Sequence, residues 1–125
     1  MNIQIKNSSK DPIYLQIKNQ IKLAILNGEL GENEPLPSIR ELAKELRVSV
    51  ITTKRAYDDL ESDGFIHSVQ GKGSFVAPQN KELLRESVLK KIEENLLKSI
   101  NYAKIIDLSR EELISMLDNL EDLNE

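Results

Sequence analysis

The stretch from residue 38 to residue 64, SIRELAKELRVSVITTKRAYDDLESDG, decides the fold of this chain. Ser38, followed three residues later by a glutamate, forms the S-x-x-E capping box that begins a helix, and the apolar spacing predicts that this helix ends near Leu46. The next three residues predict a turn, and Ser49 is a good N-cap for a second helix that ends before Gly64. Two helices separated by so short a turn are typical of a helix-turn-helix.

A further helix is predicted upstream of this stretch. Asp11 is a good N-cap, Pro12 suits the first helical position, and Gly28 is placed for a left-handed C-cap. Between them one apolar stripe recurs at helical spacing: Ile13, Ile17, Ile21, Ala24 and Ile25. Residues 29–37 hold two prolines and form a connector, and residues 1–6 alternate apolar and polar as a short strand or an extended arm would.

Residues 65–77, FIHSVQGKGSFVA, predict a β-hairpin downstream of the helices. Gln70–Gly73 make its tip, where two glycines supply the positive φ angles that tight hairpin turns require. Helix, short helix, turn, helix and two-stranded hairpin is the order of a winged helix-turn-helix. In that arrangement the third helix inserts its N-terminal end into the major groove of DNA, and the hairpin tip reaches an adjacent groove.

The pattern changes to a long helix from Lys81. It breaks at Asp107, and Ser109 with a glutamate three residues later begins a last helix. The main apolar positions of these two helices are Leu84, Val88, Ile92, Leu96, Ile100, Leu113, Leu117 and Leu120. The predicted fold class is therefore mainly α with a small β-hairpin: a winged helix-turn-helix in residues 1–79 and a C-terminal two-helix tail in residues 80–125.

Composition bounds the function. The chain has 125 residues and no cysteine. This length allows one small domain with an appendage and argues against a large two-domain enzyme. Without cysteine there is no disulfide framework and no thiolate metal site, and we expect no cofactor. The longest apolar run has four residues, whereas a membrane span needs about 20, so we expect a cytoplasmic protein without a membrane partner.

The net charge of −4 is unevenly divided along the chain. Residues 1–79 carry ten basic and ten acidic side chains, so the whole deficit belongs to residues 80–125. Within the first part, basic residues gather around the predicted DNA-facing end: Arg40, Lys44, Arg47, Lys54, Arg55 and Lys72. The net charge of the whole chain therefore does not argue against nucleic-acid binding by its first part.

Several short motifs of residues 11–77 are shared with a known family. They are Leu36–Ala43 (LPSIRELA), Val48-Ser49, Arg55-Ala56-Tyr57, Leu60-Glu61, Gly64 and Gly71-x-Gly73-x-Phe75-Val76. Together they resemble the DNA-binding domain of GntR-family bacterial transcription regulators. Pro12-Ile13-Tyr14 with Gln16-Ile17, and the short tail, are similar to the YtrA subfamily in particular. That resemblance implies a two-helix dimerisation tail and no large effector domain.

Arg40 is the candidate DNA contact with the strongest motif context. It follows the capped start of the second helix, beside Ser38, which we also count as a contact. A guanidinium is always charged and holds a phosphate through two parallel hydrogen bonds. In the resembled family the arginine that matches Arg40 binds DNA. The alternative is an arginine that pairs with Glu41 or a neighbouring acid on a solvated face.

The N-terminal end of the third helix supplies the other main contacts. At about 100° per residue, Ile51 and Arg55 point away from the predicted core, with Lys54 on a flank. Ile51, with Val50 before it, suits apolar contact with a thymine methyl, or else touches the hairpin or a neighbouring helix. Ser49 and Thr52 offer hydroxyls to phosphates while also capping the helix. Lys54 and Arg55 contact base or backbone, or pair with Asp58 and Asp59.

Two departures from the family pattern limit what can be transferred. Many members carry arginine or a small polar residue at the position of Val50, and asparagine or threonine at that of Ile51, so base preferences do not carry over.

At the hairpin tip, Lys72 suits a phosphate or minor-groove contact, and Gly71 lets the backbone approach DNA closely. The alternative for Gly71 is turn geometry alone.

The apolar tail implies a partner surface. Two helices of this length cannot bury two full apolar stripes against each other, so we expect a second copy of the chain to cover the surplus. The alternative is a tail that folds back on its own domain. A homodimer would present two recognition helices to a palindromic double-stranded operator.

We therefore expect a sequence-specific transcriptional regulator, a repressor, that acts as a homodimer. The alternative is a protein-interaction adaptor that uses the winged helix and the acidic tail, since fold does not fix function. An enzyme finds no support, because no nucleophile–base pair, metal cluster or phosphate loop is present in the sequence. An unknown small-molecule effector stays open, and it would have to use the dimer seam or the junction near Gln79.

Overall fold

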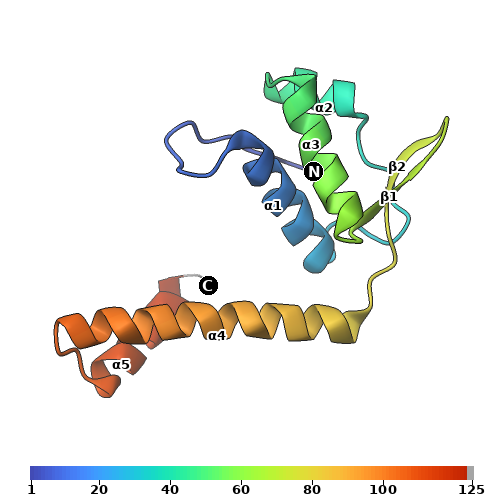
Figure 1. The fold of residues 1–125 in the computed structure, drawn as a ribbon. Coiled ribbons are helices and arrows are strands. Elements are labelled where there is room, and N and C mark those ends of the chain that lie inside the picture. The colour runs from blue at the N-terminus through green and yellow to red at the C-terminus, as the bar shows by residue number, and fades with distance from the viewer. Residues whose placement is uncertain (124–125) are drawn as a thin grey trace. The chain divides into compact units, whose positions relative to one another are not determined.

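The computed structural model divides the chain into two compact units, Met1–Asn80 and Lys81–Glu125 (Figure 1). It describes residues 1–123, apart from the side chain of Leu83. In this described part no helix is both long enough and apolar enough to cross a membrane.

Three helices make the body of the first unit: α1 (Ile13–Leu26), α2 (Ile39–Leu46) and α3 (Val50–Ser62). Helix α3 packs against both of the others (Figure 1). The largest fully buried side chains come from all three helices and from the hairpin: Ile17, Ile21, Leu42, Leu60, Ile66, Val76 and Thr53. The predicted helix-turn-helix is confirmed, and α3 is the helix against which α1, α2 and the hairpin pack.

Local caps set the ends of α2 and α3 as the sequence predicts. The Ser38 hydroxyl oxygen accepts the Glu41 backbone N–H at 3.1 Å. The Ser49 hydroxyl oxygen accepts the Thr52 backbone N–H at 3.0 Å. Between the helices, Arg47 takes a left-handed conformation with φ 58°, which ends α2 and starts the turn. Each capped end satisfies a backbone donor that a helix leaves unpaired.

The predicted cap of α1 is wrong. Asp11 does not cap the helix; Pro12 is the N-cap, with an extended backbone (φ −56°, ψ 154°) and no side-chain cap. The Pro12 carbonyl accepts the N–H groups of Leu15 and Gln16, both at 3.1 Å. The reason lies in the Gln16 side chain, whose Nε2 donates to the Asp11 carbonyl at 2.9 Å and holds that residue outside the helix.

Residues 1–6 form an extended arm rather than a strand of a sheet, and two glutamines of α1 hold it. The Gln20 side-chain amide accepts from the Gln4 N–H at 2.9 Å and donates to the Gln4 carbonyl at 2.7 Å. Gln16 does the same for Lys6, at 2.8 and 3.0 Å. The match is geometric, because four helical residues rise about 6 Å and two extended residues about 6.6 Å. Ile3 is thereby fixed in the core.

The wing is an antiparallel hairpin of β1 (Ile66–Val69) and β2 (Gly73–Val76). Its tip is one residue shorter than expected, because Gly73 pairs with Val69 and belongs to β2. The free edge of β2 is also bonded: its Ser74 carbonyl accepts the Leu36 N–H at 2.9 Å. The hairpin is therefore anchored on the connector that leads into α2.

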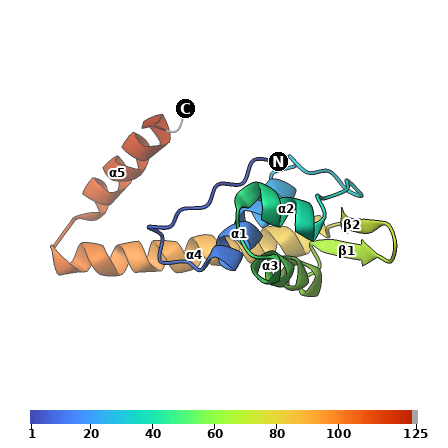
Figure 2. The same ribbon diagram turned by 90° about the horizontal axis from the view of Figure 1, so that it is seen from above.

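The second unit consists of α4 (Lys81–Ile105) and α5 (Arg110–Leu123). Asp107, with φ 53°, makes the turn between them. The Ser109 hydroxyl oxygen accepts the Glu112 N–H at 3.2 Å, so the predicted capping box begins α5. Figure 2 shows α5 diverging from α4. Among the described side chains of residues 81–123, Ala103 alone is buried, and the apolar stripe of this unit is half-buried or exposed in the single chain.

Candidate nucleic-acid interface

The start of α2 is fixed against α3 by a buried phenol. The Tyr57 hydroxyl donates to the Pro37 carbonyl at 2.7 Å. Burial raises the pKa of Tyr57 well above its usual range, and the negative charge of Glu41 adds to the rise. Tyr57 therefore stays protonated and keeps donating, which holds the N-terminus of α2 against α3.

Arg40 and Ser38 are both exposed at this N-terminus. Arg40 has no ion-pair partner among residues 1–123, so the alternative of a pair with Glu41 is wrong in this structure. The Ser38 hydroxyl oxygen is used in the cap, and its own hydrogen remains available for donation. A full positive charge and a hydroxyl donor thus lie two residues apart on an exposed helix start.

Hydroxyl groups also crowd the N-terminus of α3. The Ser49 hydroxyl donates to the Thr52 hydroxyl oxygen at 2.7 Å while accepting the Thr52 N–H. The donor hydrogen of Ser49 is thereby occupied, but that of Thr52 is free to reach an acceptor outside the protein. The buried Thr53 hydroxyl donates to the Ser49 carbonyl at 3.1 Å, so the polar atom that replaces a core aliphatic is satisfied.

Two apolar side chains stand in water at the tip of α3. Ile51 is 82% exposed and Val50 is 47% exposed. The alternative for Ile51, contact with the hairpin or a neighbouring helix, is therefore wrong in the single chain. Full burial of a β-branched aliphatic side chain contributes about 1.5–3 kcal/mol to the free energy of folding or binding, and an exposed side chain does not make this contribution. An exposed apolar tip on a recognition helix fits the methyl groups of thymine, which lie in the major groove.

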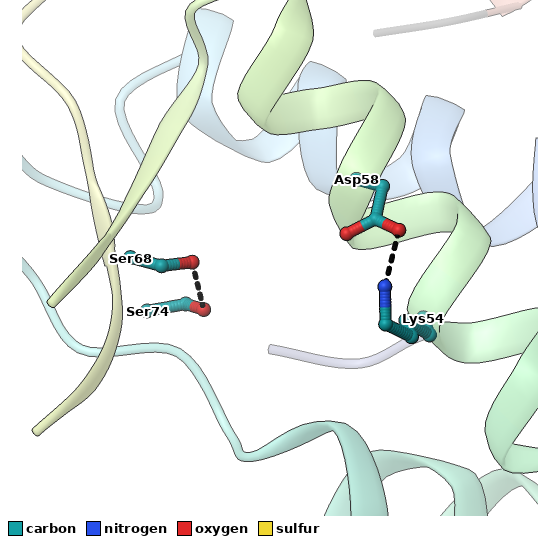
Figure 3. A network of polar contacts seen from close by, with 4 residues as sticks. All are labelled: Lys54, Asp58, Ser68 and Ser74. Atoms are coloured by element: carbon teal, nitrogen blue, oxygen red, sulfur yellow. Dashed lines mark hydrogen bonds and ion pairs between the residues drawn. The ribbon is translucent and has the colours of Figure 1, made fainter. Parts of the chain in front are cut away.

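Lys54 and Arg55 differ in what holds them. The Lys54 ammonium lies 2.7 Å from a carboxylate oxygen of Asp58, and both side chains are exposed (Figure 3). Arg55 makes no ion pair with a described residue; its guanidinium carbon lies over the Tyr14 ring, 3.7 Å from the centroid. The expected alternative of pairing is thus observed for Lys54 and not for Arg55.

The wing presents its tip with a defined geometry. Gly71 has φ 79°, which a glycine adopts without strain, and Lys72 beside it is exposed. The hydroxyl groups of Ser68 and Ser74 meet across the strands at 3.3 Å (Figure 3). The Ser68 N–H, on the outer edge of β1, donates to Glu61 Oε2 at 2.5 Å. This last bond ties the wing to the end of α3.

Two acids in the second half of α3 and the acid at its C-cap each have a partner. Asp58 pairs with Lys54, Glu61 accepts from the wing, and Asp63 lies 2.8 Å from the Lys18 ammonium. Sequence reasoning missed the roles of Tyr14 and Glu61 because both act on residues that are distant in sequence or on a backbone group. Within residues 1–123 no group of three His, Asp or Glu side chains could hold a metal ion.

Comparisons with known proteins agree with this geometry. The model of a family described as "Bacterial regulatory proteins, gntR family" matches residues 13–76. The chain is 35% identical over 111 residues to "HTH-type transcriptional repressor YtrA" of Bacillus subtilis (strain 168), which covers 89% of this chain and 85% of the relative. The likeness that the motifs predicted is confirmed, down to the subfamily.

Two solved structures extend the likeness to three dimensions. A "GntR family transcriptional regulator from Listeria monocytogenes" has a TM-score of 0.75 at 30% identity, covering 92% of this chain and 98% of that one. The structure of "AraR(DBD) in complex with operator ORX1" has a TM-score of 0.55 at 32% identity, covering 62% of this chain and 96% of that one. The predicted fold class is confirmed, and these relatives are regulators rather than enzymes.

Proposed function

We propose that this chain, which belongs to the GntR family of bacterial regulatory proteins, works as a homodimer that binds one inverted-repeat operator and represses the genes it controls. That it is a DNA-binding transcriptional regulator follows from the family. Repression is supported by relatives, since the similar proteins from Bacillus subtilis include two named as repressors. We place this activity in the cytoplasm, where operator DNA is found in bacteria.

The observation that carries the proposal is the exposed Arg40 guanidinium at the start of α2, which has no ion-pair partner within residues 1–123, together with the exposed apolar side chains at the start of α3. In the proposed complex Arg40 binds a phosphate bidentately, and Ser38 and Thr52 donate hydroxyls to the backbone. Ile51 and Val50 then meet base edges in the major groove. These contacts come from one helix-turn-helix in the first unit.

The remaining contacts need little rearrangement. Ser49 supports Thr52 at the helix start, and Lys72 with Gly71 at the wing tip reaches the adjacent backbone. Lys54 must exchange Asp58 for a phosphate or a base. That exchange costs at most about 1 kcal/mol, because an exposed ion pair contributes only about 0–1 kcal/mol.

We assign dimerisation to the second unit. The stripe of Leu84, Val88, Ile92, Leu96 and Ile100 on α4, with Leu113, Leu117 and Leu120 on α5, is half-buried or exposed in the single chain. Exposing an apolar stripe of this size to water is unfavourable. A second copy of the chain carries the same stripe and can cover it. A two-fold dimer then spaces two recognition helices along the duplex, as half-sites about 34–36 Å apart require.

Selection of bound duplexes from a random pool tests the proposal, with gel shifts on the recovered sequence and the oligomeric state from sedimentation. We expect one inverted-repeat sequence and a complex of two chains per duplex. Arg40→Ala should weaken binding about tenfold or more, because a charged hydrogen-bond pair is lost in each subunit. Lys90→Ala removes a similar exposed charge from α4 and serves as the matched control.

Three outcomes would contradict the proposal or a part of it. Recovery of no sequence preference would show that the chain does not recognise an operator. Equal binding by the Arg40 and Lys90 variants would remove Arg40 from the interface. If the chain does not bind DNA but captures another protein, and this protein complex persists at high salt, the chain is an adaptor instead.

A further inference from the structure

An aromatic ring on α1 touches a charged side chain on the recognition helix. The guanidinium carbon of Arg55 lies 3.7 Å from the centroid of the Tyr14 ring. Tyr14 belongs to the first turn of α1 and Arg55 to the second turn of α3, two helices that pack together (Figure 1). At this distance the guanidinium rests on the face of the ring, whose negative quadrupole attracts the cation.

The stack orders Arg55 without neutralising it. Ordering a free arginine side chain on binding costs rotamer entropy, and a stack formed before DNA arrives removes part of that cost from binding. Because the ring uses the face of the guanidinium, its N–H groups in the plane stay available. Asp59 lies four residues on, a spacing that suits an ion pair, yet no ion pair joins the two.

Lys54, the residue before Arg55, is held by a carboxylate and not by a ring. Its ammonium is held by Asp58 at 2.7 Å, so its charge is locally compensated in the free protein (Figure 3). Arg55 is held by a neutral ring instead. It is therefore a cation held against a ring on the exposed side of α3, without an ion-pair partner among the described residues.

The place of Arg55 on α3 indicates the kind of contact it makes. It lies one turn, about 6 Å, behind Ile51 along the helix axis and only about 40° away around it. Tyr14 draws the guanidinium from this exposed face toward α1. A cation set back from the helix tip and turned to its flank meets the phosphate backbone beside the groove rather than a base edge.

We propose that Tyr14 is a positioning residue, whose ring holds the Arg55 guanidinium ready to bind a phosphate at the flank of the recognition helix. This inference rests on the proposed operator binding and adds to it a residue of α1 that acts through Arg55. Tyr14 need not touch the DNA itself.

The test measures affinity and its salt dependence on two probes, the duplex selected by the wild-type protein and a random-sequence duplex of the same length. Arg55→Gln should weaken binding to both and reduce the slope of log K against log salt by about one per subunit. Arg55→Lys should weaken binding several-fold with nearly the wild-type slope, because the charge remains but the planar stack is lost.

Variants of the ring separate positioning from direct contact. Tyr14→Phe should bind like the wild type, because the ring face remains. Tyr14→Leu should bind several-fold more weakly, and the double variant Tyr14→Leu/Arg55→Gln should bind no more weakly than Arg55→Gln alone. The control is Phe65→Leu, which removes the other described cation–ring contact, with Lys22 at 5.5 Å, and should leave the salt slope unchanged.

Distinct results would overturn the inference. Equal losses from Tyr14→Phe and Tyr14→Leu would assign the effect to the hydroxyl, and additive losses in the double variant would show that Tyr14 acts without Arg55. If circular dichroism shows that Tyr14→Leu does not fold, Arg55→Gln decides, since an unchanged salt slope rejects the phosphate contact. Failure of the wild type to prefer the selected duplex would instead reject the proposed function itself.

Discussion

Truncation of one leucine of α4 gives a quantitative test of the proposed dimer. Leu96 is 53% exposed in the single chain. Full burial of a leucine side chain contributes about 1.5–3 kcal/mol, so covering the exposed half contributes about 1 kcal/mol per subunit. Leu96→Ala acts on both subunits of a symmetric dimer, and we expect it to weaken association by about 2 kcal/mol. That is a rise of about thirtyfold in the dimer dissociation constant.

Sedimentation equilibrium over a range of concentrations measures this constant directly. Lys90→Ala is the matched control, because it is also a truncation to alanine on α4 but removes a charged side chain about 120° around the helix from Leu96. The control should keep the wild-type constant. An unchanged constant for Leu96→Ala would refute the assignment of the stripe. A wild type that stays monomeric while Leu96→Ala melts earlier at every concentration would indicate a tail that packs on its own chain.

Three further changes have outcomes that follow from single contacts. Ile51→Ala should alter base preference in a repeated selection more than it alters affinity for random duplexes, because its exposed side chain meets base edges and no phosphate; the same selected sequence would contradict this. Because the pKa of Tyr57 is raised in the folded state, its contribution to stability is present below its usual value near 10 and is lost as the pH rises above it. Tyr57→Phe should therefore show a smaller loss of unfolding free energy above pH 10 in urea titrations, and identical profiles would argue against the buried phenol. Asp107→Gly should raise the thermal midpoint by the equivalent of about 0.5 kcal/mol, because φ is 53° there, whereas Asp118→Gly within α5 should lower it.

Local signals in the sequence predict most of the fold. Ser38, Ser49 and Ser109 each cap the helix that follows, because a cap involves only residues within one turn. Asp11 does not act as a cap, because the side chain of Gln16, from inside the helix, donates to the Asp11 carbonyl. A competing side-chain amide at that distance leaves no mark in the capping pattern.

Contacts between elements account for what the sequence did not reveal about the candidate site. Arg55 and Tyr14 belong to different helices, and nothing in their spacing states that a ring rather than Asp59 would hold the guanidinium. The bond from the Ser68 N–H to Glu61 has the same character, since a backbone donor on a strand edge carries no residue signature. Both depend on how α1, α3 and the wing pack, which only the folded unit defines.

The net charge of −4 has little bearing on DNA affinity, because affinity depends on the charges near each bound phosphate. At physiological salt, charges separated by more than about 8 Å are largely screened, so a phosphate responds to the groups around it. Near the second half of α3 the acids Asp58 and Asp63 have lysine partners. At the start of α2, Arg40 has no ion-pair partner within the described residues, and on α3 Arg55 rests on a ring. Since each bound phosphate contributes through its local cation, affinity should follow the loss of these two arginines and not changes in the acidic tail.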